Sequence, residues 1–244
     1  VDRCENQGKR SGAYSWGVYG VHPFVLMSWN DTYESMSTLA HEMGHSMHSW
    51  YSSQEQDFVN SEYTIFCAEV ASTTNENLLL EYMLQHAKGR DRLYYLNLYL
   101  EQIRTTVFRQ MLFAEFELLT HAAVEKGEAL TADKLESIWM KLNRTYYGED
   151  VVLDTELAAE WSRIPHFYRP FYVYQYATGY AAAMTLSHNL RTKGEPAQKA
   201  YLHYLASGGS DYSITLLQRA GVDMTTPEPF QITFQKFTAC LNEL

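Results

Sequence analysis

The sequence has few cysteines, no long apolar run and no secretion signal, and each shortage excludes a class of protein. The three cysteines, Cys4, Cys67 and Cys240, lie far apart and match neither a disulfide framework nor a clustered zinc–thiolate site. No stretch reaches the roughly 18 consecutive apolar residues that a membrane-spanning helix needs. The opening residues, VDRCENQGKR, lack the basic-then-apolar order of a signal peptide. We therefore expect a soluble protein in a reducing, cytoplasmic location, with no membrane partner.

Positive charge is also scarce. The 19 basic residues are outnumbered by 29 acidic ones, for a net charge of −10, which argues against a surface that neutralises phosphates and hence against a nucleic-acid partner. The chain does have an apolar share of 46% over 244 residues, enough for a substantial core. With no long linker and no internal repeat, residues 1–244 are predicted to form a single domain. Because the chain begins with Val1 in a turn-like segment, we expect it to be the C-terminal portion of something longer.

The pattern of residues predicts a mainly α-helical fold with a short β-hairpin at its start. Residues 13–29 are rich in aromatic and β-branched residues and are punctuated by glycine and proline, as in two short strands. Asn30 and Asp31 are favourable N-caps for the first helix. The SGGS segment at 207–210 is predicted to be a turn between helices, because no Gly-Lys-Ser/Thr follows it as in a phosphate loop. Helices are expected at about 31–52, 61–87, 91–126, 131–146, 171–193, 196–206, 211–220 and 229–243.

The stretch HEMGH at 41–45 fits the HExxH pattern of zinc metallopeptidases. On a helix, His41 and His45 lie on one face about 6 Å apart along the axis, so both imidazoles can reach one zinc ion. Glu42 lies about 100° around the helix from His41, and can act as a general base on a water instead of binding the metal. A pattern with three fixed positions also occurs by chance. The apolar neighbours indicate burial, however, and a buried pair of histidines with a glutamate is stabilised by a divalent cation.

His48 is a competing third ligand, but helix geometry excludes it. It lies about 10.5 Å along the axis from His41, too far for one ion bound at about 2 Å from each nitrogen. We expect it to be packed or hydrogen-bonded below the site. The longer pattern HExxHxxGxxH is absent, since position 51 is a tyrosine.

The third ligand is therefore expected from the next helix, where Glu62, Glu69 and Glu76 are spaced by seven. Glu69 stands out because it is embedded in TIFCAEVAS, where a free carboxylate would be poorly solvated. Ser72, one turn further on, can hold that carboxylate or a histidine in orientation.

With HEMGH and with Glu69 in AEVAS, the sequence resembles the oligoendopeptidase F branch of the thimet oligopeptidase (M3) family of zinc metallopeptidases. Three further stretches carry the resemblance: GAYSWGVYGVHPFVL, IPHFYRPFYVYQYATG and SGGSDYSITLLQRAGVDM. Together they span nearly the whole chain.

The resemblance implies one Zn²⁺ ion bound by His41, His45 and Glu69, with Glu42 activating the water, in a helical zincin-type domain of the gluzincin kind. It also implies a channel that admits short peptides and excludes folded proteins. Family members are roughly twice this length or more, and their N-terminal half forms the other channel wall. We therefore expect either an N-terminal companion segment or chain, or a variant with different substrate access.

In the family, a histidine and tyrosines near the equivalent of HFYRPFYVYQY face the substrate and stabilise the oxyanion. The corresponding residues here are His166, Tyr172 and Tyr176, with Tyr168 and Tyr180 as weaker matches. Pro170 suits a helix start, which would align Tyr172, Tyr176 and Tyr180 on one face. An aromatic core stripe is the alternative explanation of this row.

A zinc-dependent endopeptidase acting on short unfolded peptides is the function that these residues favour. A zinc carboxypeptidase of similar helical build is an alternative, because it also uses HExxH and a glutamate. A catalytically inactive peptide-binding or partner-binding subunit is a second alternative. It fits less well, since structural zinc sites usually have four protein ligands and commonly include cysteine. The strand around HPFVL can offer an edge to an extended peptide, or it can simply cover the active-site helix.

Overall fold

The structure, a computed structural model, describes all residues from Val1 to Leu244 and divides the chain into two compact units. Unit 1 consists of Val1–Leu100 and Gly179–Leu244, and unit 2 of Glu101–Thr178. Because this division describes packing and not independent folding, the expected single domain stays a prediction. None of the helices is long and apolar enough to cross a lipid bilayer.

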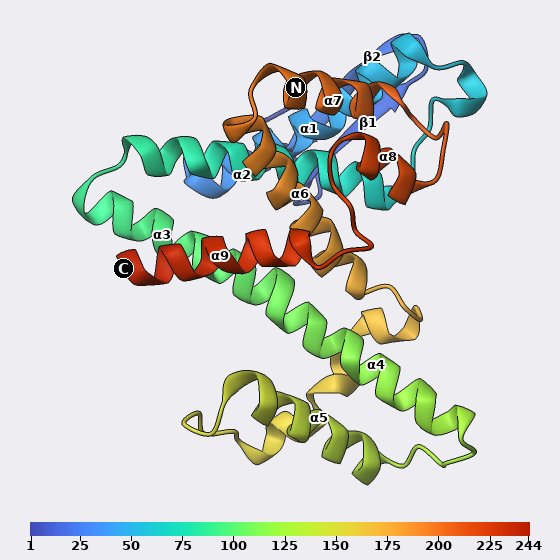
Figure 1. Ribbon diagram of the computed structural model, residues 1–244, viewed down its shortest axis with the longest axis vertical. Helices are drawn as coiled ribbons and strands as arrows, with labels where there is room; N and C mark the ends of the chain where they lie inside the picture. The colour runs from blue at the N-terminus through green and yellow to red at the C-terminus, as the bar shows by residue number, and fades with distance from the viewer. The chain divides into compact units, whose positions relative to one another are not determined.

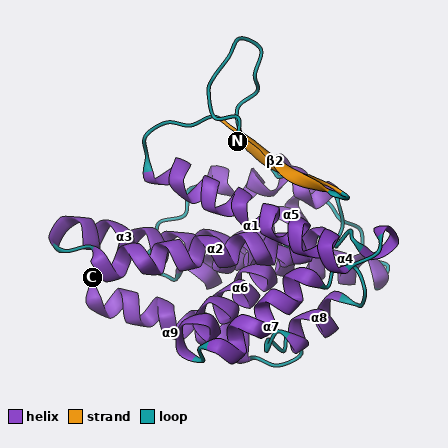
Figure 2. Ribbon diagram, turned by 90° about the horizontal axis from the view of Figure 1, so that it is seen from above, coloured by secondary structure: helices purple, strands orange, loops and turns teal.

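The fold is mainly α-helical, as predicted, with a single β-hairpin near the N-terminus (Figures 1 and 2). The hairpin consists of β1 (Ala13–Val18) and β2 (Val21–Met27), which pair antiparallel with a bulge at Gly17. The remaining elements follow in chain order: α1 (Tyr33–Glu55), η1 (Phe58–Asn60), α2 (Ile65–His86), α3 (Gly89–Ile103), η2 (Arg104–Phe108), α4 (Arg109–Glu125), α5 (Ala132–Tyr147), η3 (Thr155–Arg163), η4 (Pro165–Tyr168), α6 (Tyr174–Thr192), α7 (Glu195–Ala206), α8 (Ser213–Arg219) and α9 (Glu228–Glu243).

Helix α1 begins two residues later than its predicted start. The observed N-cap is Thr32, whose hydroxyl accepts a hydrogen bond from the backbone N–H of Ser35. The side chain of Asn30 instead accepts hydrogen bonds from the hydroxyls of Thr32 and Ser35. Asn30 therefore braces the capping residue without being the cap itself, and α1 is still fixed at the start that positions its histidines.

The close crossing of α1 and α2 depends on Gly44, inside the HEMGH stretch. A Cβ at position 44 would lie 2.6 Å from Cα of Ser72 and 3.0 Å from the carbonyl oxygen of Ala71. Side chains at this crossing would separate the two helix backbones. Gly44 thus lets α2 approach the face of α1 that carries His41 and His45.

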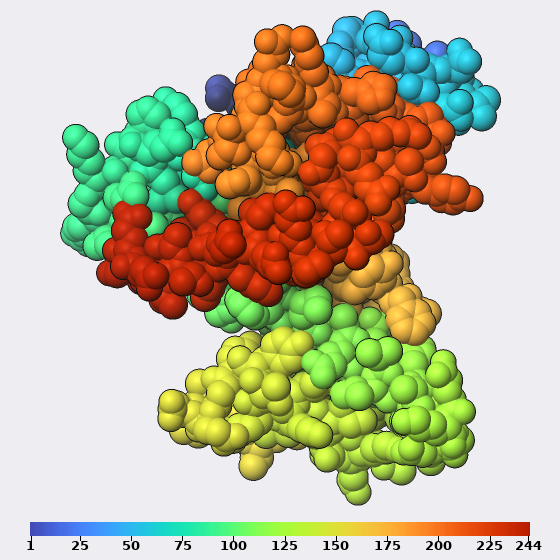
Figure 3. Space-filling model, in the orientation of Figure 1, coloured from blue at the N-terminus to red at the C-terminus, as the bar shows by residue number.

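The core of unit 1 lies where α2 packs against α6, α7 and α8. Val70 and Ala71 of α2 and Leu205 of α7 are fully buried there, and the phenol of Tyr204 donates a 2.9 Å hydrogen bond to the carbonyl of Cys67. Residues from α7 to α9 cover the middle of the face of this unit that is visible in Figure 3. The SGGS segment is a turn between α7 and α8, as predicted. Helix α2 therefore packs into this core through a face other than the one that carries Glu69.

Unit 2 has its own aromatic core, built from α4, α5 and the segment that follows them. Trp139 of α5 is fully buried, with its ring centroid 5.1 Å from that of Phe116 and 5.4 Å from that of Phe113. The predicted helix at 91–126 is observed as α3 and α4 joined by the π-helical segment η2. A π segment inside a helix is not marked in the sequence by glycine or proline, so the periodic pattern did not indicate it.

The edge of β2 that carries HPFVL is not open along its whole length. The backbone N–H of Asp2 donates to the carbonyl of Val25, and the N–H of Met27 donates to the carbonyl of Asp2, both at 2.8 Å. Because β1 takes the other edge, the Val25–Met27 part of β2 is paired on both sides. The idea that a peptide adds to this stretch was therefore wrong for its second half.

Candidate metal centre

The structure brings His41, His45 and Glu69 together as a group that can hold a metal ion, with one ligand atom from each within 4.8 Å of the others. The two Nε2 atoms are 3.1 Å apart. The Oε2 atom of Glu69 lies 3.4 Å from Nε2 of His41 and 3.9 Å from Nε2 of His45. Ligand atoms about 2.1 Å from one tetrahedral ion lie about 3.4 Å from one another. The spacing of the three atoms therefore fits one ion.

Hydrogen bonds on the far side of each ring leave the two Nε2 atoms available. Nδ1 of His41 is hydrogen-bonded to Oε1 of Glu76, and the His45 ring is hydrogen-bonded to the backbone of Ala68. Burial and, to a lesser extent, the charge of His41 lower the pKa of His45 to about 4, so its ring is neutral near pH 7. A neutral ring that donates through Nδ1 has its lone pair on Nε2. Both Nε2 atoms thus face the same point, where the lone pair on each can bind a metal ion once His41 has lost its proton.

Glu42 lies beside this group but is turned toward the hairpin. It is buried, and its atom Oε2 has no hydrogen-bond partner in the protein. Burial raises the pKa of Glu42, while His41 and a backbone hydrogen bond with Ser15 of β1 oppose the rise. An unpaired, buried carboxylate oxygen next to a metal site is the arrangement expected of a proton acceptor.

Two expectations about burial were wrong. The side chain of Glu69 is 46% exposed, so it is not the poorly solvated carboxylate that its apolar neighbours indicated. Met43, one of the apolar residues that indicated burial of the HEMGH stretch, is 41% exposed. The buried positions of α1 are instead small or polar: Ser35, Ser37, Glu42, Gly44, Ser46, His48 and Ser52. The metal group is consequently accessible from one side, where a water or substrate can enter.

Glu76, whose carboxylate is hydrogen-bonded to His41, was not singled out by the sequence. Glu76 lies two helical turns after Glu69 on α2 and is partly buried, and its heptad spacing was the only signal for it. Glu62, the third acid of that series, lies before α2 begins and is exposed. Ser72 behaves as expected, because its hydroxyl donates a 3.2 Å hydrogen bond to Oε2 of Glu69. Both the first histidine and the glutamate of the group are thus held by a further side chain.

His48 lies outside the metal group, as the helix rise predicts. It is 1% exposed, and its ring is stacked on that of Tyr63 with centroids 3.5 Å apart and planes 3° from parallel. Its Nδ1 atom has no hydrogen-bond partner. Burial, reinforced by the charge of His45, lowers the pKa of His48 to about 3. The ring therefore packs as a neutral aromatic group.

This burial predicts an acid-sensitive contribution to stability. Because the folded-state pKa of His48 lies below its unfolded value of about 6.5, its contribution is complete above pH 6.5 and is lost as the pH falls. Between pH 6.5 and 5 the loss is about 2 kcal/mol. Replacing His48 with Phe should remove this loss, which urea unfolding of the two proteins at both pH values, with a chelator present, would measure. An equal pH dependence in both proteins would contradict the assignment.

The predicted oxyanion residues form a cluster of their own in unit 2. The Tyr176 hydroxyl lies 3.2 Å from Nε2 of His166, and the rings of Tyr172 and His166 are stacked with centroids 5.7 Å apart. Tyr168 is 73% exposed and its hydroxyl donates to the carbonyl of Ser162. The structure thus brings together the three residues named first, and their role toward a substrate stays a prediction.

The prediction that Tyr172, Tyr176 and Tyr180 lie along one helix starting at Pro170 was wrong. Helix α6 begins at Tyr174, so Tyr172 precedes it and Pro170 does not start it. Between them lies Phe171, which has a left-handed backbone with φ of 58° and whose N–H donates a 2.8 Å hydrogen bond to the buried carboxylate of Glu117. A β-carbon-bearing residue in this conformation is strained and delays the helix start. Tyr180 is buried and belongs to unit 1, whereas Tyr172 and Tyr176 belong to unit 2.

Comparison with known sequences decides the family. The sequence profile of Peptidase family M3 matches residues 1–236. The chain belongs to Peptidase family M3. The resemblance seen in HEMGH, AEVAS and the tyrosine-rich stretch is thereby confirmed.

Several M3 relatives are similar along the whole chain. Oligopeptidase PepF of Bacillus subtilis is 50% identical over 245 residues, which cover 100% of this chain and 37% of that protein. Group B oligopeptidase PepB of Streptococcus agalactiae is 45% identical and is covered to 41%. The crystal structure of oligoendopeptidase-F from Enterococcus faecium is 45% identical, with a TM-score of 0.78 over 86% of this chain and 38% of that one. The chain therefore spans about two fifths of the length of the relatives that it matches.

Proposed function

We propose that the protein carrying this chain is a zinc-dependent endopeptidase that hydrolyses short, unfolded peptides at internal bonds. The observation that carries the proposal is the pair of imidazole Nε2 atoms 3.1 Å apart, with Oε2 of Glu69 beside both. Two imidazoles and one carboxylate are donors that suit zinc, and three protein ligands leave a fourth position for water or substrate. A structural zinc site would be expected to have a fourth protein ligand.

A bound zinc ion supplies a Lewis acid that lowers the pKa of a water molecule and polarises the scissile carbonyl. Glu42 accepts the proton from the attacking water through its unpaired Oε2 and then delivers it to the leaving amine. The raised pKa of Glu42, caused first by burial, brings it closer to the range in which a carboxylate can both take and return a proton. Glu76 and Ser72 hold His41 and Glu69 in the orientation that binding requires.

The role of His166, Tyr172 and Tyr176 as donors to the oxyanion is a further part of the proposal. Two facts support this role: the family resemblance, and the grouping of the three residues. In that group the hydroxyl of Tyr176 and Nε2 of His166 lie 3.2 Å apart. Donors held in such a group can stabilise negative charge that develops on a carbonyl oxygen.

A cleavage map of peptides with both ends blocked tests the proposed function. The complete protein that carries this chain, loaded with one equivalent of zinc, should cut such a peptide at an interior bond, as shown by the masses of the products. If it trims only peptides with free C-termini, the activity is that of a carboxypeptidase. Peptide binding without any turnover, at full zinc content, would instead indicate an inactive binding subunit.

Glu76 is expected to control zinc affinity through His41. Replacing it with Ala removes the acceptor of the Nδ1 hydrogen bond, so zinc affinity should fall by about 10- to 100-fold. Glu76→Gln keeps an acceptor without the charge and should lose less. Competition with a chromogenic chelator measures both variants independently of catalysis. Affinities equal to that of the unaltered protein would show that the Glu76 contact does not support the metal.

A further inference from the structure

A large cavity adjoins the metal group on the side of His45. It has a volume of about 590 Å³ and lies between β1, the second half of α1, the η1 segment and the first turn of α2. His45 itself forms part of its lining. All of these elements belong to unit 1. Anything that occupies this cavity is therefore in direct contact with a metal-ligand candidate.

The cavity wall is made largely of exposed apolar side chains. Trp16 of β1 is 67% exposed, Phe58 of η1 is 70% exposed, and Ile65 of α2 is 60% exposed. Single exposed apolar residues are ordinary, but several around one concave site next to polar groups mark a binding surface. The three come from three separate elements, β1, η1 and α2. Their arrangement favours an apolar occupant.

The floor of the cavity is rigid. The hydroxyls of Ser49 and Tyr63 are hydrogen-bonded at 2.7 Å. The Tyr63 ring is stacked on the buried ring of His48. A Cβ at Gly17 would lie 2.6 Å from Cβ of Ser49, so the bulge of β1 lies directly on α1 and closes one end. A pocket formed in advance in this way costs little ordering on binding and can discriminate between side chains by size.

Charge adds a second basis for discrimination. Glu62 forms the acidic rim of the cavity, because it is exposed and is the only acidic residue in the lining. No lysine or arginine lines the cavity. An acidic side chain placed here would meet the carboxylate of Glu62 and no basic side chain, whereas a neutral apolar one would bury its surface against the apolar wall.

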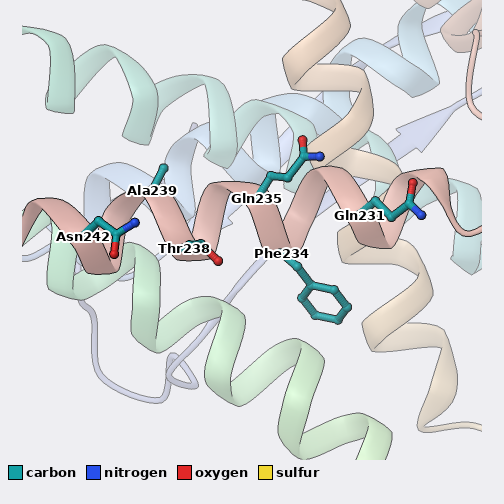
Figure 4. A pocket seen from close by; sticks show the side chains of 6 residues that line it. All are labelled: Gln231, Phe234, Gln235, Thr238, Ala239 and Asn242. Carbon is teal, nitrogen blue, oxygen red and sulfur yellow. The ribbon is translucent and has the colours of Figure 1, made fainter.

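A second hollow, along α9, lacks such features. Figure 4 shows that its lining side chains all come from one helix, and none of them is an acid or a base: Gln231, Phe234, Gln235, Thr238, Ala239 and Asn242. Nothing in it connects to the metal group or could orient a charged ligand.

We propose that the cavity beside His45 is a specificity pocket that seats one large apolar side chain of the peptide substrate, such as Phe or Leu, near the bond to be cut, and that it rejects Asp and Glu. The inference rests on the proposed peptidase function and adds the class of side chain that the site selects. Three features of the cavity identify the occupant: contact with His45 of the metal group places it near the scissile bond, the apolar wall favours an apolar side chain, and Glu62 on the rim disfavours an acidic one.

The test compares peptides that differ at one position, scanned on both sides of the scissile bond, with Ala, Leu, Phe or Glu at that position. In the complete protein, one position should show a preference for Phe over Ala of about 10-fold or more in kcat/KM, with Glu the poorest. Ile65→Ala should reduce the Phe preference several-fold at that position alone. Ser53→Phe, which fills the cavity from α1, should shift the preference toward Ala. Val59→Ala is the matched control, since Val59 is 87% exposed and does not line the cavity.

Binding to the Glu42→Gln protein separates this inference from the proposed function. Dissociation constants of the Phe, Ala and Glu peptides, measured by fluorescence anisotropy, do not depend on turnover. If the unaltered protein cuts no peptide but its Phe preference in binding is lost in Ile65→Ala, the proposed function fails and the pocket stands. If Ile65→Ala and Val59→Ala have the same side-chain profile, or if Ile65→Ala changes only the thermal stability because another segment covers the cavity, the pocket assignment is overturned.

Discussion

Replacing Glu42 with Gln is expected to lower kcat for peptide hydrolysis by about 10²- to 10⁴-fold, the usual contribution of a general base. Gln has the size of Glu and can still accept the backbone hydrogen bond with Ser15, so the hairpin should keep its place on α1. It cannot take a proton from water. Because Glu42 is not among the three grouped ligand atoms, zinc content should not change.

The matched control for this substitution is Glu34→Gln. Glu34 lies in the first turn of the same helix and is exposed, so its loss should alter neither zinc content nor rate. Both proteins would be assayed with a quenched fluorescent peptide at equal zinc content, determined by elemental analysis. Equal rates for the Glu42→Gln protein and the unaltered protein would contradict the assignment of Glu42 as the base.

Replacing Glu69 with Ala is expected to abolish both metal binding and hydrolysis. The substitution removes one of the three proposed ligands, so zinc affinity should fall by more than the roughly 10- to 100-fold expected for loss of an outer partner such as Glu76. Activity should fall to background at substoichiometric zinc and recover only in part at high zinc concentration. Equilibrium dialysis followed by elemental analysis measures the bound metal, and the peptide assay follows activity.

Glu62→Ala is the control that separates a ligand from a nearby acid. Glu62 is the acid one heptad before Glu69 and is exposed outside the metal group. Its loss should leave one equivalent of zinc bound. A Glu69→Ala protein that also retained tightly bound zinc and most of its activity would show that the third ligand lies elsewhere.

The sequence indicated the helical segments well where apolar periodicity was long, and less well where backbone details decide. The N-cap of α1 moved to Thr32 because its hydroxyl, and not the side chain of Asn30 or Asp31, accepts the hydrogen bond from the N–H of Ser35. The start of α6 moved to Tyr174 because Phe171 has a left-handed backbone that a helix cannot include. Such choices depend on contacts with other elements, including Glu117 of α4, and local sequence does not encode them.

The grouping of His41, His45 and Glu69 in space agrees with what the sequence suggested, but one reason given for Glu69 did not hold. Its apolar neighbours indicated burial, whereas the side chain is 46% exposed because it points toward α1 at the open side of the crossing. The contact between His41 and Glu76 could not be predicted, since heptad spacing leaves several acids on one face. Both Glu69 and Glu76 reach the imidazole of His41, and the close approach of α1 and α2 at Gly44 brings them there.

The most direct measurement of the central claim is a crystal structure of the zinc-loaded protein with anomalous diffraction at the zinc edge. The account predicts a single strong anomalous peak about 2.0–2.2 Å from Nε2 of His41, Nε2 of His45 and a carboxylate oxygen of Glu69, with the fourth position open to solvent. A peak at other residues, or a fourth protein side chain closing the site, would contradict it.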